Sequence, residues 1–114
     1  MAIKELLPMR ERGVCCSLPI PLPERKAETL VEALKALADP TRLQIAAILQ
    51  RSTDPVCICD LTATFELSQP TISHHMAKLK AAGLVDVTKK GLWSYYRLKT
   101  DIDPQTRSLL EALL

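Results

Sequence analysis

The sequence predicts a mainly α-helical domain that carries one small β-hairpin. Apolar residues recur at helical spacing from Glu24 onward and again close to the C-terminus. After Gly83 the apolar pattern changes to a period of two, which is typical of strands. The chain has 114 residues, a length that fits a single compact domain.

Residues 1–23 form a separate N-terminal region. It contains the pair Cys15-Cys16, and its last residues alternate proline with Ile20 and Leu22. Proline at every second position excludes a helix and cannot donate to a sheet ladder. We therefore expect an extended arm, and its apolar residues favour contact with another surface.

The domain proper covers residues 24–114, and its first two helices meet at Asp39-Pro40. Asp39 fits an N-cap, and proline is tolerated as the first helical residue. The second helix, residues 41–51, is apolar over most of its circumference, which predicts the central buried helix. The apolar residues of the first helix fall on one stripe: Ala27, Leu30, Val31, Leu34, Leu37 and Ala38.

Two further helices follow a loop. The third is expected at residues 60–65, and the short break 66–68 separates it from the fourth. Ser68 is a good N-cap for the fourth helix, and Gly83 ends that helix as its C′ residue. Its predicted buried stripe is made by Ile72, Met76 and Leu79.

The hairpin and a last helix complete the domain. Strands are expected at residues 84–88 and 93–99, joined by a four-residue connection, 89–92, that contains a glycine. Asp103-Pro104 caps the last helix. That helix is strongly apolar through Leu109, Leu110, Leu113 and Leu114.

Two helices joined by a short turn and followed by a basic hairpin make a winged helix-turn-helix. Residues 68–99 carry six cations against Asp86 alone, a net charge of +5, so the rest of the chain carries −3 of the total +2. A cationic block of this kind indicates a polyanionic partner. A protein-interaction domain of the same fold is the alternative, and salt-dependent binding to DNA separates the two.

The fourth helix and the hairpin supply the predicted DNA-binding side chains. Glutamine can pair with adenine, serine and threonine can bond to bases or phosphates, and a helix N-terminus favours a phosphate. Lysines at the hairpin tip would reach the backbone or the minor groove. The predicted set is Ser68, Gln69, Thr71, Ser73, His74, His75, Lys78, Lys89, Lys90 and Arg97.

The chain has neither an apolar run of the roughly 18 residues that a membrane span needs nor a signal-peptide pattern at its start. We therefore expect a cytoplasmic protein without a membrane partner. In that compartment four cysteines are thiols, metal ligands or redox groups rather than structural disulfides. A thiol-redox enzyme is the rival from another class, but neither a βαβ pattern nor a glycine-rich anion loop accompanies the cysteines, so no enzyme is expected.

Three segments, in the right order, closely resemble the ArsR/SmtB family of metalloregulatory repressors. Residues 67–76 (LSQPTISHHM) resemble its recognition helix, and residues 37–43 (LADPTRL) resemble the entry to its second helix. Residues 82–85 (AGLV) followed by 89–91 (KKG) resemble its junction between helix and wing. The resemblance covers about residues 24–100. It implies a repressor of double-stranded operator DNA that forms a homodimer through its first and last helices.

Residues 56–61 (VCICDL) look like the family's cysteine motif at the start of the third helix. The arsenic-sensing version often has another cysteine three residues beyond the second, where this chain has Thr62. A third ligand must then come from Cys15 or Cys16. The leading hypothesis is a site that combines both of them from one chain with Cys57 or Cys59 of the other.

Geometry constrains the choice between Cys57 and Cys59. Two residues apart on a helix, side chains point about 200° from each other. The two cysteines therefore share one ion if they lie in extended chain ahead of the helix, and otherwise only one of them joins the arm cysteines.

The number of thiolates bears on the ion. Three thiolates suit As(III) or Sb(III), whose lone pair leaves a pyramidal site, and four suit Cd(II), Pb(II) or Zn(II). The adjacent Cys15-Cys16 pair favours the metalloids as inducers, with the divalent metals as the alternative. A thiol redox sensor, or cysteines without a sensing role, remain as other interpretations. The zinc site that some family members have in the last helix is not expected, because no histidine follows Asp101 and Asp103.

Overall fold

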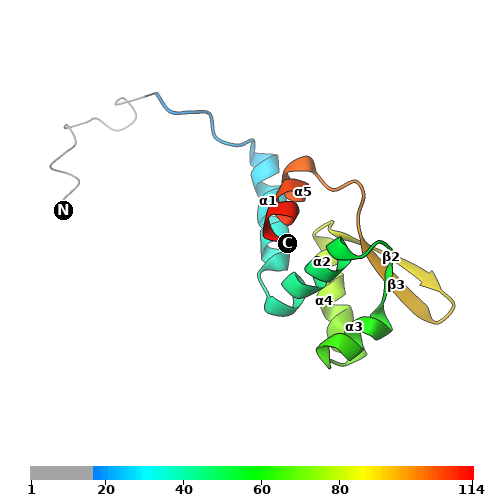
Figure 1. The fold of residues 1–114 in the computed structure, drawn as a ribbon. Helices are drawn as coiled ribbons and strands as arrows, with labels where there is room; N and C mark the ends of the chain where they lie inside the picture. The colour runs from blue at the N-terminus through cyan, green and yellow to red at the C-terminus, as the bar shows by residue number, and fades with distance from the viewer. Residues whose placement is uncertain (1–16) are drawn as a thin grey trace, which may run out of the picture.

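A computed structural model describes residues 17–114, and this part of the chain contains five helices and a small three-stranded sheet. Figure 1 shows α1 and α5 side by side at one end of the molecule and the β2–β3 hairpin projecting from the other. The elements in chain order are α1 (Glu24–Leu37), α2 (Pro40–Arg51), β1 (Val56–Cys57), α3 (Ile58–Phe65), α4 (Gln69–Ala81), β2 (Val85–Lys90), β3 (Trp93–Leu98) and α5 (Pro104–Leu113).

Side-chain caps begin the helices where the sequence predicted them. The Asp39 carboxylate accepts a hydrogen bond from the backbone N–H of Arg42 at 3.0 Å, with Pro40 as the first residue of α2. Asp103 accepts from two backbone N–H groups at the start of α5 in the same way. Each cap satisfies donors that have no partner within the helix, so these two helix starts are confirmed.

The end of α4 is confirmed in the same detail. Gly83 has a φ of +76°, a left-handed conformation that disfavours residues with a Cβ. Its N–H donates to the Lys80 carbonyl at 2.9 Å, and the N–H of Leu84 donates to the Leu79 carbonyl at 3.1 Å. This pair of bonds is a Schellman motif. Because Leu79 and Leu84 are both buried, the motif also fixes how α4 leads into the sheet.

The sheet has one strand more than the sequence predicted. β1 pairs antiparallel with β3, so the strand order is β1-β3-β2. With only two residues, β1 is too short to show a period in the sequence. The prediction for α3 is wrong by two residues for the same reason, because the helix begins at Ile58, directly after β1.

The connection between β2 and β3 is also shorter than expected. Lys89 and Lys90 belong to β2, where they pair with Ser94 and Trp93, so the predicted four-residue connection is wrong. Only Gly91 and its neighbour remain in the turn. The positive φ of Gly91, +62°, is the geometry that a two-residue hairpin turn needs at its first position.

The core is built from one face of each helix. The predicted buried stripe of α4, Ile72, Met76 and Leu79, is confirmed. In α2, Ile45 and Leu49 are buried but Leu43 is exposed, so this helix is not buried on all sides as predicted. The apolar residues on one side of α2 pack in the core, and those on the other side lie at the surface.

The apolar stripe of α1 is divided between the core and the surface. Leu37 is buried together with Ala33 and Ala36, whereas Val31 and Leu34 are 44% and 47% exposed. Leu113 of the neighbouring α5 is exposed as well. Two adjacent helices therefore present apolar side chains that the described part of the chain leaves uncovered.

Residues 17–22 of the arm are extended and lead away from α1, as Figure 1 shows. Ile20 is 93% exposed, so no surface within residues 17–114 covers it. The predicted arm carrying Cys15 and Cys16 stays a prediction, because both cysteines lie outside the described residues. None of the helices among residues 17–114 is both long enough and apolar enough to span a membrane.

Candidate nucleic-acid interface and cysteine site

The fourth helix presents most of the predicted DNA-binding residues to solvent. Gln69, Thr71, His74 and Lys78 are exposed, and Ser73 is half-buried. Ser68 is exposed too, but its hydroxyl caps the helix. It accepts from the Thr71 N–H at 3.3 Å and lies 2.9 Å from the Thr71 hydroxyl. The cap satisfies the Thr71 N–H, and because Pro70 has no N–H, that of Gln69 is the one left over in the first turn of α4.

His75 differs from its neighbours because it faces into the molecule. Its side chain is only 15% exposed, and its Nδ1 lies 3.2 Å from an Arg42 Nη1 and 3.9 Å from an Asp39 carboxylate oxygen. The Arg42 Nε donates at 2.6 Å to the Ala36 carbonyl at the end of α1. Arg42 thus connects α1 with α4, a role that the sequence analysis missed.

The same cluster perturbs one carboxyl group. The hydrogen bond from the Arg42 backbone N–H, together with the charges of Arg42 and His75, lowers the pKa of Asp39 below its ordinary value. Burial opposes this effect only in part. Asp39 therefore stays ionised as the cap of α2. Arg42 and His75 are 33 positions apart, which explains why no local sequence signal points to their contact.

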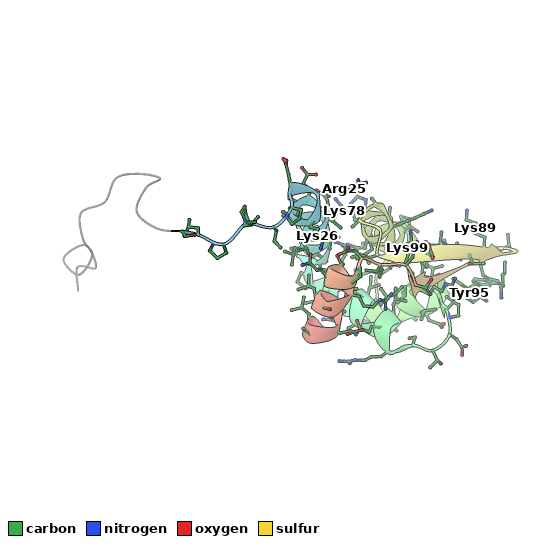
Figure 2. All side chains as sticks on the ribbon, turned by 90° about the horizontal axis from the view of Figure 1, so that it is seen from above. Arg25, Lys26, Lys78, Lys89, Tyr95 and Lys99 are labelled. Carbon is green, nitrogen blue, oxygen red and sulfur yellow. The ribbon has the colours of Figure 1, made fainter. Side chains whose placement is uncertain are left out.

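The basic residues of the hairpin are exposed. Figure 2 shows Lys89 at the outer end of the hairpin and Lys78 on a different element, α4. The Lys90 ammonium lies 5.8 Å from the centre of the Tyr95 ring, within the range of a cation–π contact. Arg97, also exposed, lies in β3 opposite Asp86.

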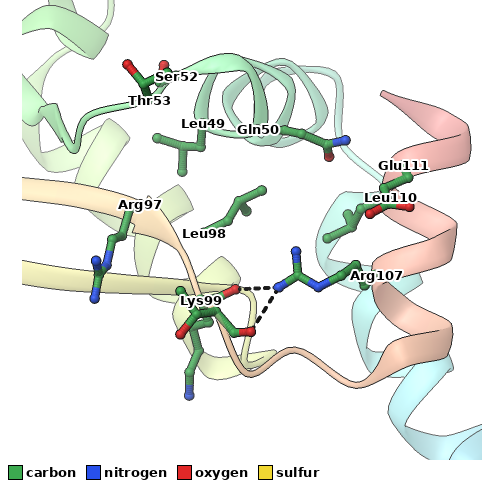
Figure 3. A pocket seen from close by; sticks show the side chains of 11 residues that line it. Leu49, Gln50, Ser52, Thr53, Arg97, Leu98, Lys99, Arg107, Leu110 and Glu111 are labelled. Carbon is green, nitrogen blue, oxygen red and sulfur yellow. Dashed lines mark hydrogen bonds between the residues drawn. The ribbon is translucent and has the colours of Figure 1, made fainter.

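Arg97 also borders a pocket of about 440 Å³ between the end of α2, β3 and α5 (Figure 3). There the Arg107 guanidinium donates to the carbonyls of Lys99 and Thr100, at 3.0 and 3.2 Å. Figure 3 shows the side chains of Arg97 and Lys99 pointing away from Arg107. The three cations therefore do not converge on one point, and Arg107 ties α5 to the segment that follows β3.

Cys57 and Cys59 lie at the junction between β1 and α3. Cys57 is the N-cap of α3, and its Sγ accepts a hydrogen bond from the Cys59 N–H at 3.4 Å. The two sulfur atoms are 2.7 Å apart. Neither of the two expected geometries applies, because one cysteine is still extended and the other is already helical. The cap turns both thiols to the same side.

This thiol pair has the chemistry of half an ion site. Sulfur atoms bound to one tetrahedral Zn(II) lie about 3.8 Å apart, so a small rotation of either side chain would let both bind the same soft ion. Cys57 is buried and Cys59 is exposed, which leaves one side of the pair open. Among residues 17–114, no cluster of three or more His, Cys, Asp or Glu side chains could hold a metal. Further ligands must therefore come from elsewhere.

The surroundings of the pair keep Cys59 protonated. The hydrogen bond to Cys57, partial burial and the neighbouring Asp60 carboxylate all raise the pKa of the Cys59 thiol above its ordinary value. Thr62, at the position where the sequence lacks a further cysteine, donates its hydroxyl to the Cys59 carbonyl at 2.8 Å. The Thr62 hydroxyl is therefore hydrogen-bonded to the backbone of α3.

Comparison with known proteins identifies relatives of this chain. A family model described as "Bacterial regulatory protein, arsR family" matches residues 39–87, which run from the cap of α2 into β2. The chain is 39% identical over 80 residues to the arsenic resistance transcriptional regulator ArsR1 of Pseudomonas putida, a match that spans 70% of this chain and 62% of that protein. It is 42% identical over 82 residues to the arsenical resistance operon repressor of Bacillus subtilis, covering 68% of this chain and 76% of the repressor.

A solved structure shares the architecture. The winged helix-turn-helix DNA-binding domain of Mb0332 from Mycobacterium bovis, which is described as homodimeric and as a possible ArsR-family regulator, has a TM-score of 0.64 and 26% identity. The match covers 80% of this chain and 82% of that domain. The matched relatives are transcription regulators and not enzymes. The predicted winged helix-turn-helix fold is confirmed.

Proposed function

Because the chain belongs to the ArsR family of bacterial regulatory proteins, we propose that it is a dimeric repressor that As(III) or Sb(III) releases from operator DNA. The observation that carries the proposal is the pair of thiols at the start of α3, with sulfur atoms 2.7 Å apart. Soft thiolates select soft ions, and this pair lies on the helix that packs directly against α4.

DNA binding is assigned to α4 and the hairpin. The exposed side chains Gln69, His74 and Lys78 are available to base edges and phosphates in a major groove. The exposed Lys89 and Lys90 supply phosphate contacts from the hairpin. His75 is better explained as a support for α4, since Arg42 and Asp39 hold it inside the molecule. The repressor acts in the cytoplasm, where its operator lies.

Dimerisation is assigned to α1 and α5. Both helices present exposed apolar side chains, among them Val31, Leu34 and Leu113, which a second copy would cover. A two-fold dimer places two α4 helices on successive major grooves of a two-fold operator. The curated relatives are described as arsenical resistance regulators, which supports a role in the same response.

The arm completes the ion site in this proposal. Cys16 precedes Glu24 by eight residues, and extended chain of that length spans about 25 Å. Residues 17–22 lead away from the body of their own chain, and in the proposal Cys15 and Cys16 bind together with Cys57 or Cys59 of the partner subunit. Three thiolates would then surround a pyramidal As(III) or Sb(III) ion.

Release from DNA follows from linkage between the two sites. Binding of the ion requires Cys57 or Cys59 to turn toward the arm, which disturbs the start of α3. Because α3 packs against α4, a change at the start of α3 shifts α4 as well. The dimer geometry that favours the ion then differs from the one that places both α4 helices on the operator. Coupling between two such sites is typically worth about 1–3 kcal/mol, or roughly 5–150-fold in DNA affinity.

Fluorescence anisotropy tests the proposal. The full chain is mixed with a labelled duplex that it has enriched from a randomised pool, and arsenite, antimonite, cadmium, lead and zinc are titrated separately. We expect DNA binding that weakens with salt and release by arsenite and antimonite. Release by cadmium or lead alone would support the alternative in which all four cysteines bind a divalent metal. An absence of release by any ion would overturn the sensing function.

Two arm variants locate the site. Cys15→Ser and Cys16→Ser should bind DNA as tightly as the unaltered chain but no longer respond to arsenite. Ser17→Ala, also in the arm, is the matched control and should respond normally. Arsenite release from both cysteine variants would contradict a site that includes the arm.

A further inference from the structure

The outer end of the hairpin is apolar, although basic residues flank it. Leu92 is 97% exposed and Trp93 is 52% exposed, whereas Lys89 and Lys90 precede the turn. Single exposed leucines are common on protein surfaces and need no explanation by themselves. Leu92 differs from these because it follows Lys89 and Lys90 at the tip of the hairpin, the element to which we assign phosphate contacts. Its position therefore places it close to bound DNA.

The geometry of the hairpin determines which side chain can reach furthest. β1 pairs with β3 only at Tyr95 and Tyr96, so beyond Tyr95 the hairpin is a free two-stranded ribbon. Neighbouring strands lie about 4.8 Å apart before their side chains are counted. The minor groove of B-DNA is about 6 Å wide, so it admits the turn but not the ribbon.

Within the turn only one residue has a side chain to insert. Gly91 provides the positive φ that closes the hairpin and has no side chain, so Leu92 is the outermost one. Trp93 and Lys90 form a cross-strand pair directly behind it, and Lys89 pairs with Ser94. Both lysines therefore lie on β2, directly behind the turn, from where they can contact the phosphates that border the groove.

We propose that Leu92 is an apolar wedge that the hairpin inserts into the minor groove of bound DNA, with Trp93 against the groove wall. This inference rests on the proposed DNA binding and deepens it. Leucine is among the side chains that partly unstack a base step and kink the duplex. Pyrimidine–purine steps deform most easily. The wedge therefore selects a flexible step beside the bases that α4 contacts, and it bends the DNA there.

Trp93 reports on the insertion directly because it is the only tryptophan of the chain. In the free protein its exposed indole should be quenched by acrylamide. On the enriched duplex the quenching should fall and the emission should shift to shorter wavelength. Unchanged quenching on DNA that anisotropy shows to be bound would overturn the proposal and leave the proposed repressor function intact.

Two substitutions at the tip separate a wedge from a simple phosphate contact. Leu92→Ser should weaken binding to the duplex by about tenfold, which corresponds to about 1.4 kcal/mol, and should reduce the DNA bend measured by energy transfer between labelled duplex ends. Leu92→Lys should reduce the bend as well. If the tip contacted phosphates only, the added charge would instead tighten binding and leave the bend unchanged, which would refute the wedge.

Ile20→Ser is the matched control, because Ile20 is as exposed as Leu92 but lies in the arm. It should leave both the affinity and the bend unchanged. Equal weakening by Ile20→Ser and Leu92→Ser would refute a specific role for the tip. If the unaltered chain bound no DNA at all, the proposed function itself would fail, and that outcome is distinct from those of the variants.

Discussion

Two helices that pack against each other, α3 and α4, both begin with a side-chain cap, but a thiol caps α3 and a hydroxyl caps α4. The Cys57 sulfur accepts the N–H of Cys59 at 3.4 Å, and the Ser68 oxygen accepts the N–H of Thr71 at 3.3 Å. Sulfur is a weak acceptor and oxygen a good one. The helix assigned to ion sensing therefore has the weaker start, and the helix assigned to DNA binding has the stronger one.

This difference suits the two roles. The hydrogen bond to the Cys57 sulfur contributes little free energy, so it can break when the sulfur turns toward an ion. The first turn of α3 can then rearrange with a small loss of stability. The chain between the helices is short, and Glu66 within it has a left-handed φ of +53°. A change at α3 therefore passes to α4 through a tight connection and a shared core, while the first turn of α4 itself stays intact.

The largest expected effect comes from the thiols. One of the two variants Cys57→Ser and Cys59→Ser should abolish release from DNA by arsenite, because the three-thiolate site takes one of these cysteines beside Cys15 and Cys16. The coupling of about 1–3 kcal/mol would then vanish. Anisotropy with and without arsenite measures it. Thr62→Ser, in the same turn of α3, is the control and should keep the response. Full release from both cysteine variants would remove the sensing role from α3.

Arg42→Met tests whether α4 is also held from the side of α2. The substitution removes the hydrogen bonds to the Ala36 carbonyl and to His75, both partly buried, and should lower the free energy of unfolding by about 2 kcal/mol. Urea unfolding measures this change. Arg51→Met, which removes an exposed bond to the Leu114 carbonyl, should cost under about 0.5 kcal/mol. Equal effects of the two variants would mean that Arg42 does not fix α4.

A direct comparison of the two caps comes next in size. Ser68→Ala should lower the free energy of unfolding by about 1 kcal/mol, the usual effect of losing a hydroxyl cap. Cys57→Ser replaces the thiol with a better acceptor of similar shape and should change stability by less than about 0.5 kcal/mol. Thermal unfolding of both variants measures the difference. A larger loss for Cys57→Ser than for Ser68→Ala would show that the thiol cap is not the weaker one.

How far the sequence predicts this structure depends on how local each signal is. Ser68 and Gly83 mark the two ends of α4 because capping and the left-handed turn act within a few residues, and both predictions are confirmed. The contact between Arg42 and His75 joins residues 33 positions apart, so the sequence placed His75 with the DNA-binding residues and missed its inward orientation.

The cysteines show a different kind of limit. The sequence allows helical or extended geometry at Cys57 and Cys59, but the junction between β1 and α3 combines the two. A strand of two residues has no recognisable period, so only the pairing with β3 identifies β1 as a strand. The apolar stripe of α1 is present, but a periodic pattern does not state which part of it faces the core and which part is left exposed.

A charged cap should differ from both the thiol and the hydroxyl in its response to pH, and this is the smallest effect we expect. The pKa of Asp39 is lowered by the Arg42 N–H and by the charges of Arg42 and His75, so its contribution to stability is present above its ordinary pKa and is lost as the pH falls through the lower folded value. Asp39→Asn keeps a capping oxygen without the charge. Urea unfolding should therefore find the variant less stable at pH 6 and equal to the unaltered chain in acid. Ser68→Ala should instead keep the same deficit at both pH values, because the free energy of its lost cap involves no proton.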